Sequence, residues 1–177
     1  MSEIILHQYQ GSPFSEKVRA LLGYKNASYT MVNIPVIMPK PDLMALTGGY
    51  RKTPVMQIGA DIYCDSAIIC RVIDRLYPDK SIYPKNQEAT LGAAAHWVDT
   101  FFFKVTVAMA FQPKSLAQNK AFTDPKVAKA FMEDRRQLAK GSADIGMDLS
   151  IAKAHWLMHL TRLENQLATA NYLGGQA

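Results

Sequence analysis

The pattern of apolar and polar residues changes character once along the chain, from short segments to long helical ones. Near the N-terminus, residues 4–9 are apolar and aromatic, as in a strand, and from Phe14 to Leu22 apolar residues recur at helical spacing. Residues 28–34 are again rich in β-branched and aromatic side chains, which favours a second strand. A strand, a helix and a strand within about thirty residues are typical of a βαβ unit, so we expect these two strands to be parallel.

The next part of the chain predicts two more strands and another helix. After a proline-rich loop with one or two helical turns near residues 42–46, the segments 53–58 and 62–64 are predicted strands that a tight turn joins as an antiparallel hairpin. A helix with one apolar face follows and ends before Pro78. The predicted order is therefore βαβ, a loop and ββα, which gives an α/β domain with a mixed sheet.

Beyond a polar linker at residues 78–86, the signals for strands nearly vanish. Helices are expected over residues 88–111, 125–139 and 151–170. In the last of these, one apolar stripe is expected to pack in a core: Trp156, Leu160, Leu163, Leu167 and Ala170. The chain is therefore predicted to divide into an α/β domain at residues 1–77, the linker, and an all-α helical-bundle domain at residues 87–177.

Composition narrows the class of protein. Of the 177 residues, 49% are hydrophobic and 20% are charged, as in a folded globular protein. The net charge of +5 is scattered without a block of like charge, and no nucleic-acid motif is present, so no nucleic acid is expected as a partner. The chain shows no leader-like N-terminus and no uninterrupted apolar run of about 18 residues, so we expect neither secretion nor a membrane partner.

The cysteines and histidines suggest neither a redox centre nor a metal site. Cys64 and Cys70 form neither a CxxC pair nor a metal framework, and they fit a reducing, cytoplasmic location. His155 and His159 lie four residues apart, but no carboxylate or cysteine nearby completes a set of ligands. We therefore expect no metal.

The first candidate for chemistry is the corner where the first strand meets the first helix. Pro13 suits the first turn of a helix, where its missing N–H is not needed, and Ser12 then falls at the N-cap. A small hydroxyl at that place lies beside the positive end of the helix dipole, which favours an anion such as a thiolate. The alternative is an ordinary helix cap.

Two further features point to the ligand. An X-Pro bond such as Thr53-Pro54 can be cis. We expect a cis bond here, which would leave the backbone of Thr53 open to pairing with an extended peptide. At the start of the following helix, Ser66 and the backbone N–H groups suit a carboxylate, and Asp65 suits an ammonium group. A carboxylate, an ammonium group, an extended peptide backbone and a thiol together describe glutathione.

With these features the chain resembles the glutathione S-transferase family. The octet at residues 12–19, SPFSEKVR, is similar to the start of the first helix in the serine- and cysteine-type classes, zeta and omega among them, whose first position carries the catalytic hydroxyl or thiol. Thr53-Pro54-Val55 resembles the segment that pairs with the cysteinyl backbone of glutathione, and Asp65-Ser66 resembles the pair that holds its γ-glutamyl end. Lys40-Pro41 matches a Lys-Pro of the omega class, whose lysine meets the glycyl carboxylate.

The resemblance implies a thioredoxin-like N-terminal domain, a helical second domain, and glutathione as cosubstrate without a metal. It implies that Ser12 is catalytic and donates a hydrogen bond to the glutathione sulfur. The implied glutathione-binding residues are Phe14, Lys40, Thr53, Pro54, Asp65 and Ser66. Alternatives for the catalytic hydroxyl are Tyr9 and Ser15, although Ser15, one turn into the helix, is expected at the surface. Because Ser12 stands where the omega class has a cysteine, thiol–disulfide exchange is not expected.

The function implied is transfer of glutathione to a small apolar electrophile, as in detoxification. The alternative is a binding or regulatory module with the same fold and no turnover. A homodimer is expected, with the helix at residues 88–111 in the interface, because its aromatic rings cannot all face one core. Family members usually continue beyond the segment at residues 172–175, so the second domain is expected to be incomplete.

Overall fold

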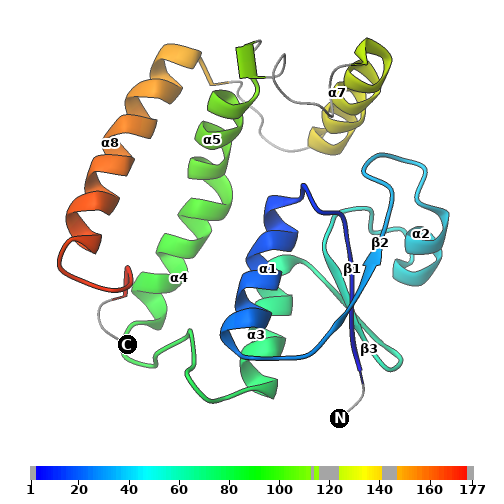
Figure 1. The fold of residues 1–177 in the computed structure, drawn as a ribbon, viewed down its shortest axis with the longest axis horizontal. Helices are drawn as coiled ribbons and strands as arrows, with labels where there is room; N and C mark the ends of the chain where they lie inside the picture. Colours follow the sequence, from blue (N-terminus) through cyan, green and yellow to red (C-terminus); the bar gives the residue numbers. More distant parts are fainter. Residues whose placement is uncertain (1–2, 113, 116–123, 141–146, 175–177) are drawn as a thin grey trace. The chain divides into compact units, whose positions relative to one another are not determined.

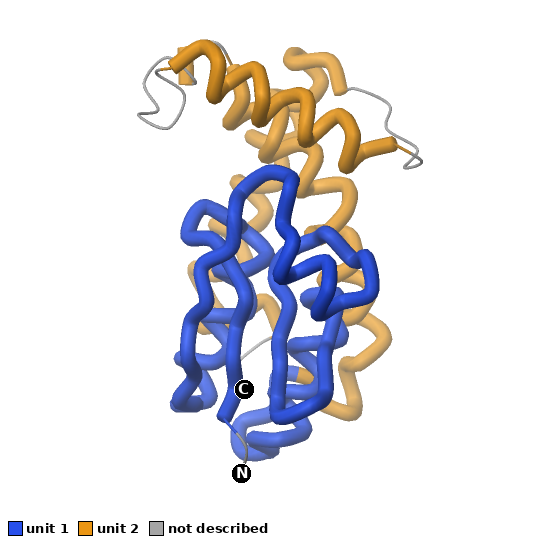
Figure 2. Tube along the Cα trace, turned by 90° about the vertical axis from the view of Figure 1, so that its right-hand side faces the viewer, with its two compact units in different colours: residues 1–82 blue, residues 83–177 orange. Residues whose placement is uncertain are grey.

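The computed structural model describes residues 3–112, 114–115, 124–140 and 147–174. The chain divides into two compact units, residues 1–82 and residues 83–177, shown in different colours in Figure 2. The first unit holds a four-stranded sheet with helices, and the elements assigned in the described part of the second unit are all helices.

The sheet of the first unit is mixed, as predicted. Its strands are β1 (Ile4–Gln8), β2 (Thr30–Asn33), β3 (Val55–Ile58) and β4 (Asp61–Cys64), in the spatial order β2-β1-β3-β4. The β1 and β2 strands are parallel because a helix crosses between them, whereas β3 runs antiparallel to both β1 and β4.

Helices cover the sheet from both sides. Helices α1 (Pro13–Tyr24) and α3 (Ser66–Leu76) lie side by side along one side of the strands, and the short α2 (Pro41–Thr47) lies on the other (Figure 1). The core between α1, α3 and the sheet is built from apolar side chains that are almost fully buried, among them Leu6, Val18, Leu22, Met56, Ile69 and Ile73. This burial is the main favourable contribution to folding of the unit.

Strand register brings three loops to one edge of the sheet. His7 near the end of β1 pairs with Val55 at the start of β3, and Val55 pairs with Cys64 at the end of β4. The chain therefore leaves or enters the sheet on the same row at the β1–α1 corner, at Thr53-Pro54 and at the start of α3. These are the three places that carry the predicted chemistry.

A buried ion pair fastens the end of α3 to the end of α1. The Lys25 ammonium lies 2.7 Å from an Asp74 carboxylate oxygen, and the two side chains are 1% and 11% exposed. Burial by itself raises the pKa of Asp74, but hydrogen bonds from Lys25, Ser81 and Ile82, with the charge of Lys25, outweigh it and hold the pKa below its ordinary value. The Lys25 ammonium also donates to three backbone carbonyls in the segment after α3, those of Tyr77, Asp79 and Lys80.

The helices of the second unit agree with the predicted ones except in two respects. They are α4 (Glu88–Trp97), a π-helical segment (Val98–Phe102), α5 (Phe103–Ala110), α7 (Pro125–Ala139) and α8 (Leu149–Leu167). The helix predicted over residues 88–111 is thus interrupted by a π-helical turn, which inserts a residue into the helical repeat. The last helix begins two residues earlier than expected and ends at Leu167. Most of the segment between the helices predicted at residues 125–139 and 151–170 lies outside the described residues.

The core of the second unit differs from the prediction. Three rings pack against rings of α8. The centroids lie 4.5 Å apart for Trp97 and His159, 5.0 Å for Phe101 and His155, and 5.7 Å for Phe102 and Trp156. The π-helical turn places Phe101 and Phe102 on the side that faces α8, so these rings meet partners within their own unit. The predicted stripe on α8 is wrong in part, because Leu160 and Leu167 are 39% and 49% exposed.

No helix among the described residues is long and apolar enough to cross a membrane. Within the same residues, no three histidine, cysteine, aspartate or glutamate side chains gather as a metal ion would require.

Candidate functional site

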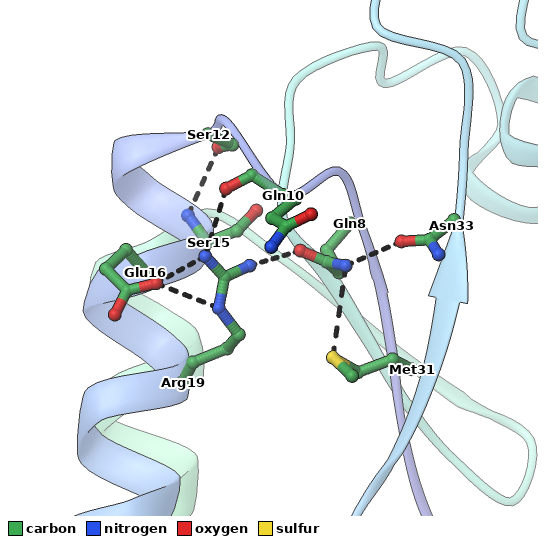
Figure 3. Close-up of polar contacts among 8 residues, drawn as sticks. All are labelled: Gln8, Gln10, Ser12, Ser15, Glu16, Arg19, Met31 and Asn33. Carbon is green, nitrogen blue, oxygen red and sulfur yellow. Dashed lines mark hydrogen bonds and ion pairs between the residues drawn. The ribbon is translucent and has the colours of Figure 1, made fainter.

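Ser12 caps α1, as the sequence predicted. Its backbone is extended (φ −83°, ψ 117°), and its Oγ accepts a hydrogen bond from the Ser15 backbone N–H at 3.2 Å (Figure 3). Its own backbone N–H donates to the Tyr9 carbonyl at 3.1 Å and closes the corner after β1. Because Oγ acts as an acceptor in the cap, the hydroxyl hydrogen of Ser12 remains available as a donor. Ser12 is 2% exposed.

Ser15 is buried, which corrects the expectation of a surface hydroxyl. It lies on the same side of α1 as Val18, Leu21 and Leu22, which all face the core. Among the described residues its Oγ has no hydrogen-bond partner, and its exposure is 0%. A buried hydroxyl lowers the stability of the fold unless a hydrogen-bond partner satisfies it. The helical spacing of Ser15 and Val18 was the signal in the sequence for this burial.

Thr53-Pro54 forms the second part of the site, together with Lys40. The Thr53-Pro54 peptide bond is cis, as predicted, and so is Met38-Pro39, which the sequence reasoning missed. Lys40, at the N-cap of α2, is only 3% exposed. Its ammonium lies 3.3 Å from the Thr53 hydroxyl and 5.5 Å from the centre of the Tyr9 ring. Lys40 is thus held inward beside the corner rather than in solvent.

The third part is the start of α3. Asp65 caps the helix by accepting from the Ala67 backbone N–H at 2.8 Å, and it does so at a positive φ of 78°, which an aspartate adopts only under constraint. Ser66 is 9% exposed, and its Oγ accepts from the Lys17 ammonium at 3.3 Å. Lys17 in turn lies 6.0 Å from the centre of the Phe14 ring. Lys17 therefore contacts both Phe14 and Ser66, two residues predicted to bind glutathione. Lys17 itself was not predicted from the sequence.

Two ionisable groups beside α3 stay protonated at neutral pH. Burial raises the pKa of the Cys64 thiol above its ordinary value. Burial also raises the pKa of the Tyr50 phenol, and the negative charge of Asp65 adds to that shift. At neutral pH Cys64 is therefore a thiol rather than a thiolate.

Comparison with known proteins relates residues 6–81 to a known family. Residues 6–81 match the family described as glutathione S-transferase, N-terminal domain. A GST-like protein from Pseudomonas syringae, known from its crystal structure, is 39% identical and superposes with a TM-score of 0.76 over 100% of this chain and 54% of that chain. Residues 6–81 of this chain thus correspond to the N-terminal domain of the glutathione S-transferase family. The predicted resemblance is confirmed, and so is the fold class, a thioredoxin-like α/β domain followed by a helical domain.

Further matches show how much of a full-length relative this chain spans. A probable glutathione S-transferase of Solanum tuberosum is 29% identical over 86 residues, which are 49% of this chain and 40% of the relative. A theta-class glutathione S-transferase from Xanthomonas axonopodis pv. citri, solved with glutathione bound, shares the fold at 19% identity and a TM-score of 0.65, over 100% of this chain and 76% of that chain. The chain thus spans about half the length of the Pseudomonas syringae protein (54%) and less of the Solanum tuberosum one.

Proposed function

We propose that this chain binds glutathione at the sheet edge of residues 1–82 and transfers it to small, apolar electrophiles. The observation that carries the proposal is the position of the Ser12 hydroxyl. It stands at the N-cap of α1, on the row of the sheet from which Thr53 and Ser66 also emerge. A tripeptide laid along that row would meet all three.

The chemical role proposed for Ser12 is to stabilise the glutathione thiolate. The hydroxyl donates a hydrogen bond to sulfur, and the positive end of α1 adds to its effect. A thiol ionises near pH ~8.5, and lowering its pKa by about two units takes roughly 2.7 kcal/mol of preferential stabilisation. A hydrogen bond to a charged group supplies about 1.5–3 kcal/mol and a helix terminus about 0.3–1 kcal/mol, so the two together suffice. The thiol proton passes to solvent, and the sulfur then forms a bond to the electrophilic carbon as the leaving group departs with its electron pair.

The ends of glutathione are assigned to the two outer parts of the site. The Ser66 hydroxyl, the Lys17 ammonium and the first N–H groups of α3 suit the γ-glutamyl carboxylate, with Asp65 for the ammonium group. Lys40 suits the glycyl carboxylate, since its ammonium stands at the Thr53 hydroxyl on the other side of the corner. The backbone of Thr53-Pro54 would pair with the cysteinyl residue between them, and Phe14 lines the same end as Lys17.

The alternative is a glutathione-binding or regulatory module without turnover. The burial of Ser12 favours it, because a side chain that is 2% exposed is less accessible to a ligand. Retention of the full chain on immobilised glutathione, followed by a conjugation assay with a chlorodinitrobenzene, separates the two. Retention with turnover supports the transferase, and retention without turnover supports the module. A chain that is not retained would contradict both.

A detoxifying role, a cytoplasmic location and a homodimer belong to the same proposal and rest on the family. Cys64 and Cys70 carry no disulfide, which fits a reducing compartment. The rings that suggested a dimer surface find partners within residues 83–177, including Phe111, which stacks on Phe131 with centroids 5.9 Å apart. They therefore give the dimer no support, and light scattering on the full chain is its test.

A further inference from the structure

A buried glutamine at the end of β1 connects the first helix with the edge strand of the sheet. Gln8 is 3% exposed, and a buried amide is stable only when its oxygen and nitrogen are both paired. Its oxygen accepts from the Arg19 guanidinium, and its nitrogen donates to the Asn33 side-chain oxygen at 2.7 Å (Figure 3). The amide also lies 3.9 Å from the sulfur of Met31.

Arg19 is hydrogen-bonded to the corner between β1 and α1 that carries Ser12. The guanidinium projects from α1, and one of its nitrogens donates to the backbone carbonyl of Gln10 at 3.2 Å. Gln10 lies inside the turn that the Ser12 N–H closes onto Tyr9. Glu16, one turn earlier in α1, accepts from Arg19 Nε at 3.0 Å and fixes the plane of the guanidinium from the opposite side (Figure 3).

For holding the corner, the planar geometry of the Arg19 guanidinium matters more than its charge. A guanidinium is planar and rigid, so one Arg19 side chain fixes Gln8, Gln10 and Glu16 relative to one another. A lysine ammonium would keep the charge but cannot hold three acceptors in these directions. The hydrogen bonds of Arg19 go to Gln8, Gln10 and Glu16 and not to Ser12 or a residue assigned to glutathione, so an effect on chemistry would pass through the corner.

We propose that Arg19, anchored to the sheet by Gln8, is the positioning residue that sets the Ser12 hydroxyl at the glutathione sulfur. This inference rests on the proposed role of Ser12. A corner released from Arg19 keeps the cap and the hydrogen bond from the Ser12 N–H to the Tyr9 carbonyl, but it loses the contacts that fix Gln10 relative to Gln8 and α1. Displacements of about 1 Å at a reacting group lower rates by up to about a hundredfold, whereas binding of the tripeptide ends is unaffected.

The test uses paired variants of the full chain. In Arg19→Lys and Gln8→Met, kcat for conjugation is expected to fall about ten- to hundred-fold, while KM for glutathione changes by less than about twofold. The pKa of bound glutathione, followed by thiolate absorbance in the ultraviolet, is expected to rise toward its value in Ser12→Gly. Gln8→Glu keeps an acceptor for Arg19, and Asn33 can turn its amide to donate, so this variant is expected to behave like the unchanged protein. Arg75→Lys, an exposed arginine at the end of α3, is the matched control.

Two outcomes overturn the proposal in distinguishable ways. Suppose that Arg19→Lys and Gln8→Met unfold at lower urea concentrations but keep the pKa of the bound thiol and kcat. The hydrogen bonds of Arg19 and Gln8 then only stabilise the fold. If Ser12→Gly itself keeps both values, the proposed role of Ser12 is wrong and the positioning role falls with it. Should Arg19→Lys fail to fold, Gln8→Met decides alone, because it retains the contacts of Arg19 with Gln10 and Glu16.

Discussion

Replacing Ser12 by alanine and by glycine separates the two roles of its hydroxyl, capping α1 and facing the sulfur. The cap is the 3.2 Å hydrogen bond from the Ser15 N–H. Losing it to alanine costs about 1 kcal/mol of stability, whereas glycine at an N-cap costs only a few tenths of a kcal/mol. The loss of the donor to sulfur is the same in both variants. Equal loss of turnover with unequal loss of stability is therefore the expected signature.

The size of the turnover loss follows from the fraction of glutathione present as thiolate. With a bound-thiol pKa about two units below ~8.5, most of the ligand is ionised at pH ~7, and without the hydroxyl only a few per cent is. We expect kcat at neutral pH to fall by at least about tenfold in both Ser12 variants, with little change in KM, because the hydroxyl acts on the sulfur and not on the ends of the tripeptide. Raising the pH above the pKa of the free thiol should restore much of the loss.

The assay is steady-state conjugation across pH, paired with urea unfolding of each variant. Ser15→Ala is the matched control on the same helix. Its buried Oγ has no hydrogen-bond partner among the described residues, so its removal should leave turnover intact and stability equal or higher by up to about 1 kcal/mol. Unchanged turnover in both Ser12 variants, with loss in Ser15→Ala or in Tyr9→Phe, would refute the assignment of the catalytic hydroxyl.

Three other variants test the rest of the site and the frame that holds it. Ser66→Ala should raise KM for glutathione with less effect on kcat in the same assay, because it removes binding shared by ground and transition states; an unchanged KM would show that the γ-glutamyl end lies elsewhere. Lys17→Gln should raise KM in the same way, since Lys17 stands at the Ser66 hydroxyl, and Ser66→Ala should then add little to it. Asp74→Asn should lower the free energy of unfolding in urea by about 3 kcal/mol, because it leaves the Lys25 ammonium without its buried counter-charge. The lowered pKa of Asp74 contributes stability that is present above the ordinary pKa of an aspartate and is lost as the pH falls through the pKa of Asp74 in the folded protein. Asp74→Asn should therefore lose less stability on acidification below pH ~4 than the unchanged protein.

The parts of the fold that local residue patterns determine were predictable. The cap at Ser12, the helix from Pro13 and the cis bond before Pro54 each depend on a few adjacent residues, and all three are confirmed. The mixed sheet also followed from the sequence, because a crossover helix requires parallel strands and a tight hairpin requires antiparallel ones.

Contacts between distant residues were not predictable from one sequence. Lys17 reaches Ser66 across 49 positions, and nothing in the spacing of α1 indicates which residue of α3 it meets. The same holds for Gln8, whose burial depends on acceptors and donors from α1 and β2. On α8, the predicted buried stripe rested on apolar spacing alone and included Leu160, which is exposed. The rings that α8 faces are positioned by the π-helical turn at residues 98–102, and this turn has no simple sequence signal.

The most direct test of the proposed site is a crystal structure of the full chain with glutathione bound. We predict that the sulfur lies within hydrogen-bonding distance of the Ser12 Oγ, with the γ-glutamyl carboxylate at Ser66 and Lys17 and the glycyl carboxylate at Lys40. A sulfur placed at Tyr9, or a tripeptide bound away from the row of His7, Val55 and Cys64, would contradict the proposal.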